Sequence, residues 1–183
     1  MTPRSAPHLL AALTARTRAN LTAAGQLRQA TEAQLTSKPH EKAWNAVECL
    51  EHLNRYGDIY LPEIERRLFA KEYPAAATFT SSWLGNKIAA GMKPGPKTRR
   101  VKTFPSKNPL GMQVDRRVID IFIEQQEWTL RLLEEAASAD LTRVKTKTSL
   151  PLLKLRLGDT LRTLVYHNWR HVDQALRAAG MAD

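Results

Sequence analysis

The chain has 183 residues, of which 43% are hydrophobic, so its length and composition suit one domain built around one core. Its single cysteine, Cys49, excludes an internal disulfide, and nothing else in the sequence requires an oxidising compartment. No apolar run approaches the roughly 20 residues of a membrane span, and the start of the chain lacks the apolar segment of a secretion signal. We therefore expect one domain over residues 1–183 in the cytoplasm, not in a membrane.

The net charge of +10 is concentrated in two stretches that contain no acidic residue. Residues 74–114 contribute seven lysines and arginines, and residues 141–158 contribute five. The remaining residues therefore sum to a charge of −2. The basic character belongs to connections between predicted helices and not to the helices themselves.

The predicted elements begin with a helix over residues 6–36, where leucines recur among many alanines. A second helix is predicted after Asn45, because Asn45 can cap it and Glu48 stands three residues on, as in a capping box. We expect this second helix to continue to about Glu72.

A long connection is predicted next, over about residues 73–111, because nine prolines and glycines interrupt this stretch. A connection of this length is uncommon in a compact domain and is typical of a lid or a partner surface. Phe79 and Trp83 could line a pocket there or fix the connection to the core, and we expect the second role.

The third predicted helix spans residues 112–137, and the fourth begins with Asp159 as a cap and ends near Ala179, with Gly180 as the stop. Between them, residues 138–158 are expected to form a loop or a short extended piece. Four long amphipathic helices and no convincing strand predict an all-α protein, a four-helix bundle.

Three of the five histidines form the candidate metal site. His167 and His171 stand four residues apart on one predicted helix, so their Cβ atoms lie about 5–6 Å apart on one face. That spacing lets two imidazoles reach one ion, and His52 could supply a third from another helix. His8 and His40 are expected to be bystanders. Because a histidine beside an apolar face is often only a packing residue, the spacing by itself leaves both interpretations open.

At 100° per residue, each of these histidines flanks the apolar face of its helix and does not lie at its middle. This position predicts a site at the side of the core that solvent can reach. An exchangeable ligand would require such access.

The residues around these histidines resemble a known family. The stretch WNAVECLEHL, residues 44–53, is similar to the second-helix signature of the DinB/YfiT-like superfamily, and HNWRHVDQ, residues 167–174, is similar to its fourth-helix motif. The resemblance implies an up-down-down-up bundle with a long basic crossover between the second and third helices. It also implies that His52, His167 and His171 bind nickel or zinc. Characterised members include transferases of low-molecular-weight thiols, which implies a thiol as a cofactor or substrate.

Four further residues are candidates for roles beside the metal. Glu48, one turn before His52, could act as a base on bound water, although its capping box explains it equally well. Tyr56 and Gln174 could hydrogen-bond the histidines from outside. Cys49 could be a fourth ligand, but we expect a buried packing residue.

Two classes of function remain open. The first is a metal-dependent thiol transferase or hydrolase that acts on a small molecule. The second is a non-catalytic, metal-stabilised bundle whose basic loop, Lys93–Lys107, binds a polyanion such as nucleic acid. Nucleic acid is disfavoured because the loop has one aromatic residue, Phe104, and no known motif. The loop could instead steer an anionic thiol toward the metal, and a homodimer stays open.

Overall fold

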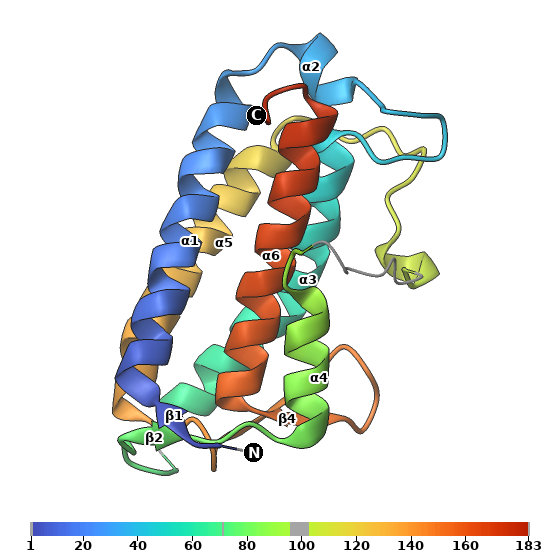
Figure 1. The fold of residues 1–183 in the computed structure, drawn as a ribbon. Coiled ribbons are helices and arrows are strands. Elements are labelled where there is room, and N and C mark those ends of the chain that lie inside the picture. Colours follow the sequence, from blue (N-terminus) through green and yellow to red (C-terminus); the bar gives the residue numbers. More distant parts are fainter. Residues whose placement is uncertain (1, 71, 96–102, 183) are drawn as a thin grey trace.

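The computed structural model describes residues 2–70, 72–95 and 103–182, and most of these residues are helical. The long helices α1, α3, α5 and α6 lie side by side (Figure 1), and α1 and α3 are each packed against both α5 and α6. Their bounds are α1 Ala6–Gln29, α3 Ala46–Phe69, α5 Val118–Glu135 and α6 Leu157–Ala178. None of the described helices is both long and apolar enough to cross a membrane.

Shorter elements fill the connections. They are the helices α2 Glu32–Thr36 and α4 Trp83–Met92, and the single 3-10 turns Pro105–Lys107 and Ala136–Ser138. The apolar faces of the long helices form two core clusters. One cluster combines Leu13 of α1, Leu61 of α3 and Leu161 of α6, and the other combines Leu50 of α3 with Phe122 of α5.

The predicted start of α3 is confirmed. The side chain of Asn45 accepts a hydrogen bond from the backbone of Glu48 at 2.8 Å, and the carboxylate of Glu48 accepts one from the backbone of Asn45 at 2.9 Å. A second capping box, at Thr31 and Gln34, starts α2. The prediction of one helix over residues 6–36 is therefore wrong. The first helix ends at Gln29, and Thr31 caps the start of α2.

Other helix ends differ from the predictions by a few residues. α3 ends at Phe69, three residues before Glu72, and α5 begins at Val118, six residues after the predicted start. The prediction that Asp159 caps the fourth helix is wrong. Asp159 lies inside the first turn of α6, and its side chain accepts a hydrogen bond from the backbone of Ser82. Gly180 has a φ of +67°, a left-handed conformation that suits the end of a helix.

The long connection contains a helix that the sequence does not predict, because Gly85 and Gly91 look like helix breakers there. α4 begins after Ser82, whose side chain accepts from the backbone of Gly85 at 2.9 Å. A Cβ at Gly85 would lie 2.2 Å from a carboxylate oxygen of Asp159, so this glycine permits a close approach and does not interrupt the helix.

Four short strands correct the expectation of a protein without strands. β1 (Arg4–Ser5) pairs with β2 (Thr78–Phe79), and β3 (Lys145–Lys147) pairs with β4 (Lys154–Arg156), both antiparallel. Strands of two or three residues are too short to show an alternating pattern. The extended piece expected within residues 138–158 is the hairpin of β3 and β4. Phe79 is fully buried, as expected of an anchor, whereas Trp83 is 71% exposed.

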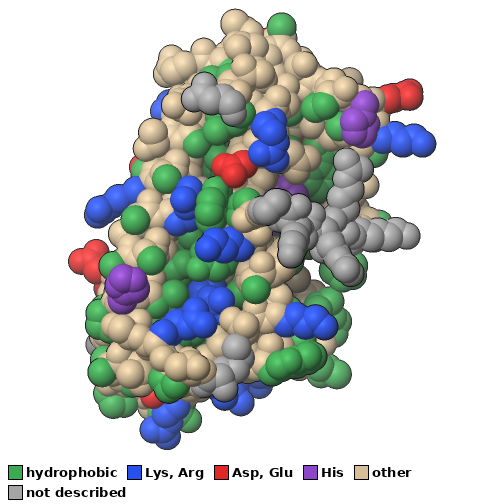
Figure 2. Space-filling model, in the orientation of Figure 1, with side chains coloured by type: hydrophobic (Ala, Val, Ile, Leu, Met, Phe, Trp, Pro, Cys, Tyr) green, Lys and Arg blue, Asp and Glu red, His purple; other side chains and the backbone are tan. Residues whose placement is uncertain are grey.

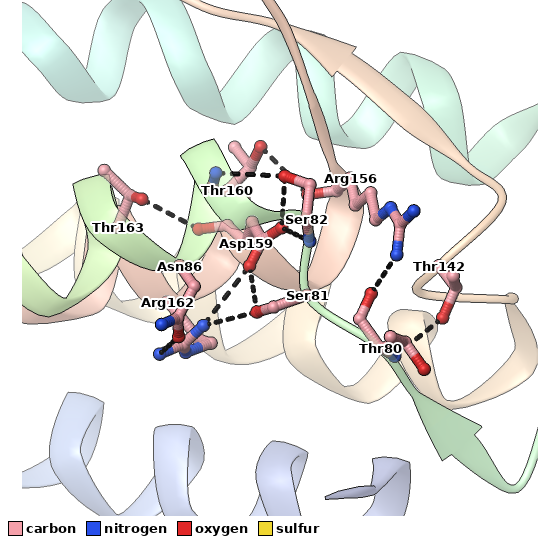
Figure 3. Close-up of polar contacts among 11 residues, drawn as sticks. Thr80, Ser81, Ser82, Asn86, Thr142, Arg156, Asp159, Thr160, Arg162 and Thr163 are labelled. Atoms are coloured by element: carbon pink, nitrogen blue, oxygen red, sulfur yellow. Dashed lines mark hydrogen bonds and ion pairs between the residues drawn. The ribbon is translucent and has the colours of Figure 1, made fainter. Parts of the chain in front are cut away.

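Buried polar contacts hold the start of α4 against α6 (Figure 3). Asp159 accepts hydrogen bonds from the hydroxyl of Ser81 and from the backbone of Ser82. Arg162 donates to the hydroxyl of Ser81 at 2.7 Å and to the side chain of Asn86 at 3.1 Å. The connection between α3 and α5 is thus fixed to the helix that carries His167 and His171.

Candidate metal centre

Histidines from two helices converge in one group. His52 comes from α3, His167 and His171 come from α6, and their ligand-capable atoms all lie within 4.8 Å of one another. Nε2 of His52 is 3.2 Å from Nε2 of His167. Two nitrogens bound to one tetrahedral zinc at ~2.0–2.1 Å would be about 3.3 Å apart. The three histidines therefore form a group that could hold a metal ion.

Two of the rings are held by the nitrogen that faces away from the group. Nδ1 of His52 donates to the backbone carbonyl of Lys107 at 2.7 Å, and Nδ1 of His171 donates to Oε1 of Gln174 at 2.9 Å. A neutral imidazole carries one proton, so these bonds leave Nε2 of His52 and His171 unprotonated, each with a lone pair that can accept a hydrogen bond or bind a metal. Outer hydrogen bonds of this kind are typical of histidines that bind metals.

The group is neutral at physiological pH. Burial, opposed by the Lys107 hydrogen bond, lowers the pKa of His52 to about 4. Burial and the neighbouring His52 lower the pKa of His171 to about 3. Burial and the charge of His171 hold the pKa of His167 well below its ordinary value. Neutral imidazole is the form that binds a metal.

The short contact between His52 and His167 requires either a hydrogen atom or a cation between the two nitrogens. Two nitrogen lone pairs facing each other at 3.2 Å would repel. Either His167 carries its proton on Nε2 and donates to His52, or a cation takes the place of that proton. The donor set fits the second arrangement, because imidazole nitrogen suits zinc and nickel.

Two aromatic side chains enclose the group. The ring of Trp44 lies 4.6 Å from that of His52 and 5.6 Å from that of His171, between centroids. The ring of Tyr56 lies edge-on to His52 at 5.1 Å and to His167 at 4.9 Å. His52 is only 3% exposed, whereas His171 keeps partial exposure. Any access of solvent to the three histidines is therefore from the side of α6.

Tyr56 and Gln174 both lie at the group. Gln174 accepts the hydrogen bond from His171. Tyr56 contacts the histidines with its ring, and among the described residues its hydroxyl forms no hydrogen bond to any of the three. Burial and the neighbouring Tyr60 raise the pKa of Tyr56, so its hydroxyl stays protonated at neutral pH. Their roles beside a metal remain predictions.

Glu48 and Cys49 have other partners. Glu48 is buried, and its carboxylate accepts from the backbone of Asn45, the ammonium of Lys38 at 2.8 Å and the backbone of Gly111 at 2.8 Å. These contacts support its capping role, and its role as a base remains a prediction. Cys49 is buried, and burial followed by the charge of Glu48 raises the pKa of its thiol. Cys49 packs in the core cluster of Leu50 and Phe122 and does not belong to the group of three histidines, so we describe it as a packing residue.

Sequence reasoning missed the role of the 106–111 segment, which lies against the first half of α3. Five side-chain hydrogen bonds join it to α3 and to Trp44 just before α3. They pair Arg55 with Ser106, His52 with Lys107, Lys107 with Arg55, Trp44 with Asn108 and Glu48 with Gly111. Three of the five use a backbone atom of the segment. No residue pattern marks a backbone carbonyl as the partner of a histidine, so sequence reasoning could not find it.

The comparison with known families bears on this group. A model of the DinB superfamily matches residues 13–175, which include all three histidines. The chain belongs to the DinB superfamily. The resemblance carried by residues 44–53 and 167–174 is thereby confirmed. No curated protein and no solved structure matches the chain closely.

Proposed function

We propose that this DinB-superfamily protein binds one nickel or zinc ion through His52, His167 and His171, and that it is a thiol transferase or hydrolase for a small molecule. One observation carries the proposal. Three neutral imidazoles from two helices meet, and outer hydrogen bonds leave Nε2 of His52 and His171 unprotonated. A hydrogen-bonded packing histidine needs no such convergence.

The proposal includes an up-down-down-up path for the four long helices, with the crossover between α3 and α5. The composition of the core supports it. One cluster joins Leu13 and Leu161, which lie early in α1 and α6, to Leu61 and Leu133, which lie late in α3 and α5. Such a path brings the histidines of α3 and α6 together.

The proposed chemistry follows from the charge of the donor set. With three neutral ligands, a bound divalent ion would lower the pKa of a water or thiol in its remaining position and favour the anion there. The chain itself orients the rings through the Lys107 carbonyl and Gln174. Trp44 and Tyr56 give the group an aromatic wall, which restricts water and could contact an apolar part of the substrate.

The basic loop remains part of the proposal as an element that steers an anionic thiol. Lys97, Arg99 and Arg100, on which that prediction rests, lie outside the described residues. Replacing all three by Gln is expected to raise the apparent KM for an anionic thiol with less effect on kcat, and high salt is expected to reduce the difference. Loss of polyanion binding with unchanged kinetics would favour the non-catalytic bundle instead.

Metal analysis of protein purified without an affinity tag tests the metal site. We expect about one nickel or zinc ion per chain, and less than a tenth of that in His171→Ala. His40→Ala is the matched control, since His40 is exposed and does not belong to the group of three. It is expected to keep the metal. Helical circular dichroism checks that each variant folds.

Activity is tested separately on protein shown to hold metal. A screen of low-molecular-weight thiols against electrophiles is expected to reveal a transfer that His171→Ala loses and His40→Ala keeps. Wild-type protein without metal, or metal retained by His171→Ala, would contradict the site. Full metal without any thiol or hydrolytic turnover would contradict the enzyme and leave the metal site standing.

A further inference from the structure

A second polar site lies beside the hairpin of β3 and β4, at the far end of α3. It is a hollow of about 270 Å³, lined by Glu63, Arg66, Arg67, Glu72, Tyr73, Arg143, Lys145, Lys147 and Lys154. Glu63 follows His52 by eleven residues on α3, which is about 16 Å along a helix that rises 1.5 Å per residue. The hollow is therefore separate from the histidine group.

The hairpin presents lysines on its outer face at a cost in stability. Thr146 and Leu155 are buried, and the alternation of a strand then turns Lys145, Lys147 and Lys154 outward. Lys147 stands directly opposite Lys154 in the register of the two strands. Like charges in that position destabilise a strand pair. Within residues 2–70, 72–95 and 103–182, none of these three lysines forms an ion pair.

The two carboxylates at the hollow are already used. Glu63 binds the guanidinium of Arg66 at 2.8 Å and the backbone of Lys147 at 2.9 Å. Burial raises the pKa of Glu63, but these hydrogen bonds outweigh it and lower the pKa overall, so the carboxylate is ionised. Glu72 pairs with Arg67 at 2.9 Å. Six cations and two carboxylates leave the hollow with a net charge of +4.

One cation and one ring form a fixed edge of the hollow. The guanidinium of Arg143 lies 4.2 Å from the centroid of the Tyr73 ring, a stacked contact that holds a planar cation in place. Arginine and lysine together suit phosphate oxygens, to which they donate charge-assisted hydrogen bonds. A single carboxylate would neutralise only a quarter of the excess charge, whereas a phosphate or pyrophosphate neutralises much more of it.

We propose that this hollow binds a small molecule that carries a phosphate or pyrophosphate group. Its shape favours a small ligand over nucleic acid. The cations surround one bounded hollow at the end of α3, whereas a nucleic-acid backbone is bound by cations spread along an extended surface. The site and its ligand do not depend on the metal centre.

Calorimetric titration of the full-length protein with inorganic pyrophosphate tests the proposal. We expect one site, and at least tenfold weaker binding in Lys147→Gln/Lys154→Gln. Arg18→Gln/Lys42→Gln is the matched control, because it removes the same charge from two exposed positions elsewhere and is expected to bind as wild type. His171→Ala is also expected to bind as wild type, which excludes binding of pyrophosphate through a metal ion.

Three results would overturn the proposal. They are no binding at millimolar pyrophosphate, equal weakening in both double variants, and loss of binding in His171→Ala. Titration with a single-stranded oligonucleotide can give a fourth such result. If it binds through Lys147 and Lys154 more tightly than pyrophosphate does, the surface binds nucleic acid and the small-ligand proposal is wrong.

Discussion

The two basic stretches that contain no acidic residue differ in the contacts that they make in the structure. The first, residues 74–114, contributes to the interior: its helix α4 is held to α6, and its 106–111 segment holds His52. The second, residues 141–158, includes the hairpin and keeps its lysines exposed. Figure 2 shows that Lys and Arg side chains are spread over this face of the molecule among hydrophobic ones.

This difference shows that the density of charged residues along a sequence does not predict whether a segment packs against the interior or stays exposed. The polar groups that it meets as partners decide the outcome. Asp159 and the α3 side chains give the first stretch buried acceptors and donors, whereas no hairpin lysine forms an ion pair with any acid in the described part of the chain. The following four predictions test this contrast, from the largest expected effect to the smallest.

Asp159→Ala is expected to have the largest effect on stability. It removes the acceptor for Ser81 and Ser82 and leaves the buried guanidinium of Arg162 without its carboxylate. Loss of one partner of a buried ion pair costs about 3–5 kcal/mol. Urea unfolding measures it. Asp120→Ala is the control, because Asp120 pairs with Arg28 on the surface and is expected to cost about 0–1 kcal/mol. Equal costs would show that the first stretch is not fixed by this contact.

Acidification is expected to destabilise the metal-free protein. The folded-state pKa values of His52 and His171 are lowered to about 4 and about 3, so the unfolded chain binds more protons below pH 6.5. Stability is fully present above that pH and is lost as the pH falls toward the folded-state values. The loss at pH 5 is on the order of 2 kcal/mol for each ring.

Urea unfolding of chelator-treated protein at pH 7 and pH 5 measures this loss. His52→Gln is expected to reduce the dependence on pH, because it removes one of the three rings whose pKa is lowered. Lys147→Gln/Lys154→Gln is expected to keep the full dependence, since the hairpin lies at the other end of α3. A stability that does not change between pH 7 and pH 5 would contradict the description of the rings as buried and neutral.

Asn108→Ala is expected to weaken metal binding about tenfold, as changes in the outer hydrogen bonds of metal sites do. Oδ1 of Asn108 accepts from the indole of Trp44 at 3.0 Å and from the backbone of Leu110 at 3.2 Å. Its loss frees the segment whose Lys107 carbonyl orients His52. Competition with a coloured chelator gives the affinity. Thr148→Ala, in the hairpin, is the control, and the same loss there would mean that the 106–111 segment has no special role.

Lys154→Glu is expected to have the smallest effect, and a stabilising one. It turns the like-charge pair with Lys147 into an opposite-charge pair, which is worth about 0.2–1 kcal/mol. Thermal unfolding measures the rise in Tm. Lys42→Glu, at an exposed position outside the hairpin, is the control and is expected to leave Tm nearly unchanged. A lower Tm for Lys154→Glu would show that the lysines stabilise the hairpin.

Local signals in the sequence predicted well where the partners are also local. The Asn45 cap depends on Glu48 three residues away, and the His167 and His171 pair depends on one helical turn. His52 was a candidate third ligand as the only other histidine on a predicted helix, and the family resemblance supported that choice, because no local rule relates residues 115 positions apart.

The predictions failed where a distant partner decides. Asp159 looks like a cap, but Ser81 and Ser82 take its carboxylate. Gly85 looks like a helix breaker, but it lies inside α4, at a point where Asp159 of α6 leaves no room for a side chain. The Lys107 carbonyl has no signature at all. In each case the decisive contact is with a residue more than 50 positions away.

X-ray absorption at the metal edge of untagged protein tests the central claim most directly, because it reports which atoms surround the ion. We expect nitrogen or oxygen neighbours at ~2.0–2.1 Å with the outer-shell scattering of three imidazoles, and one imidazole fewer in any metal that His171→Ala retains. In protein purified without added thiol, a sulfur neighbour at ~2.3 Å would assign Cys49 to the metal and contradict the buried, protonated thiol described above. A shell of oxygens without imidazole would contradict the three-histidine site itself.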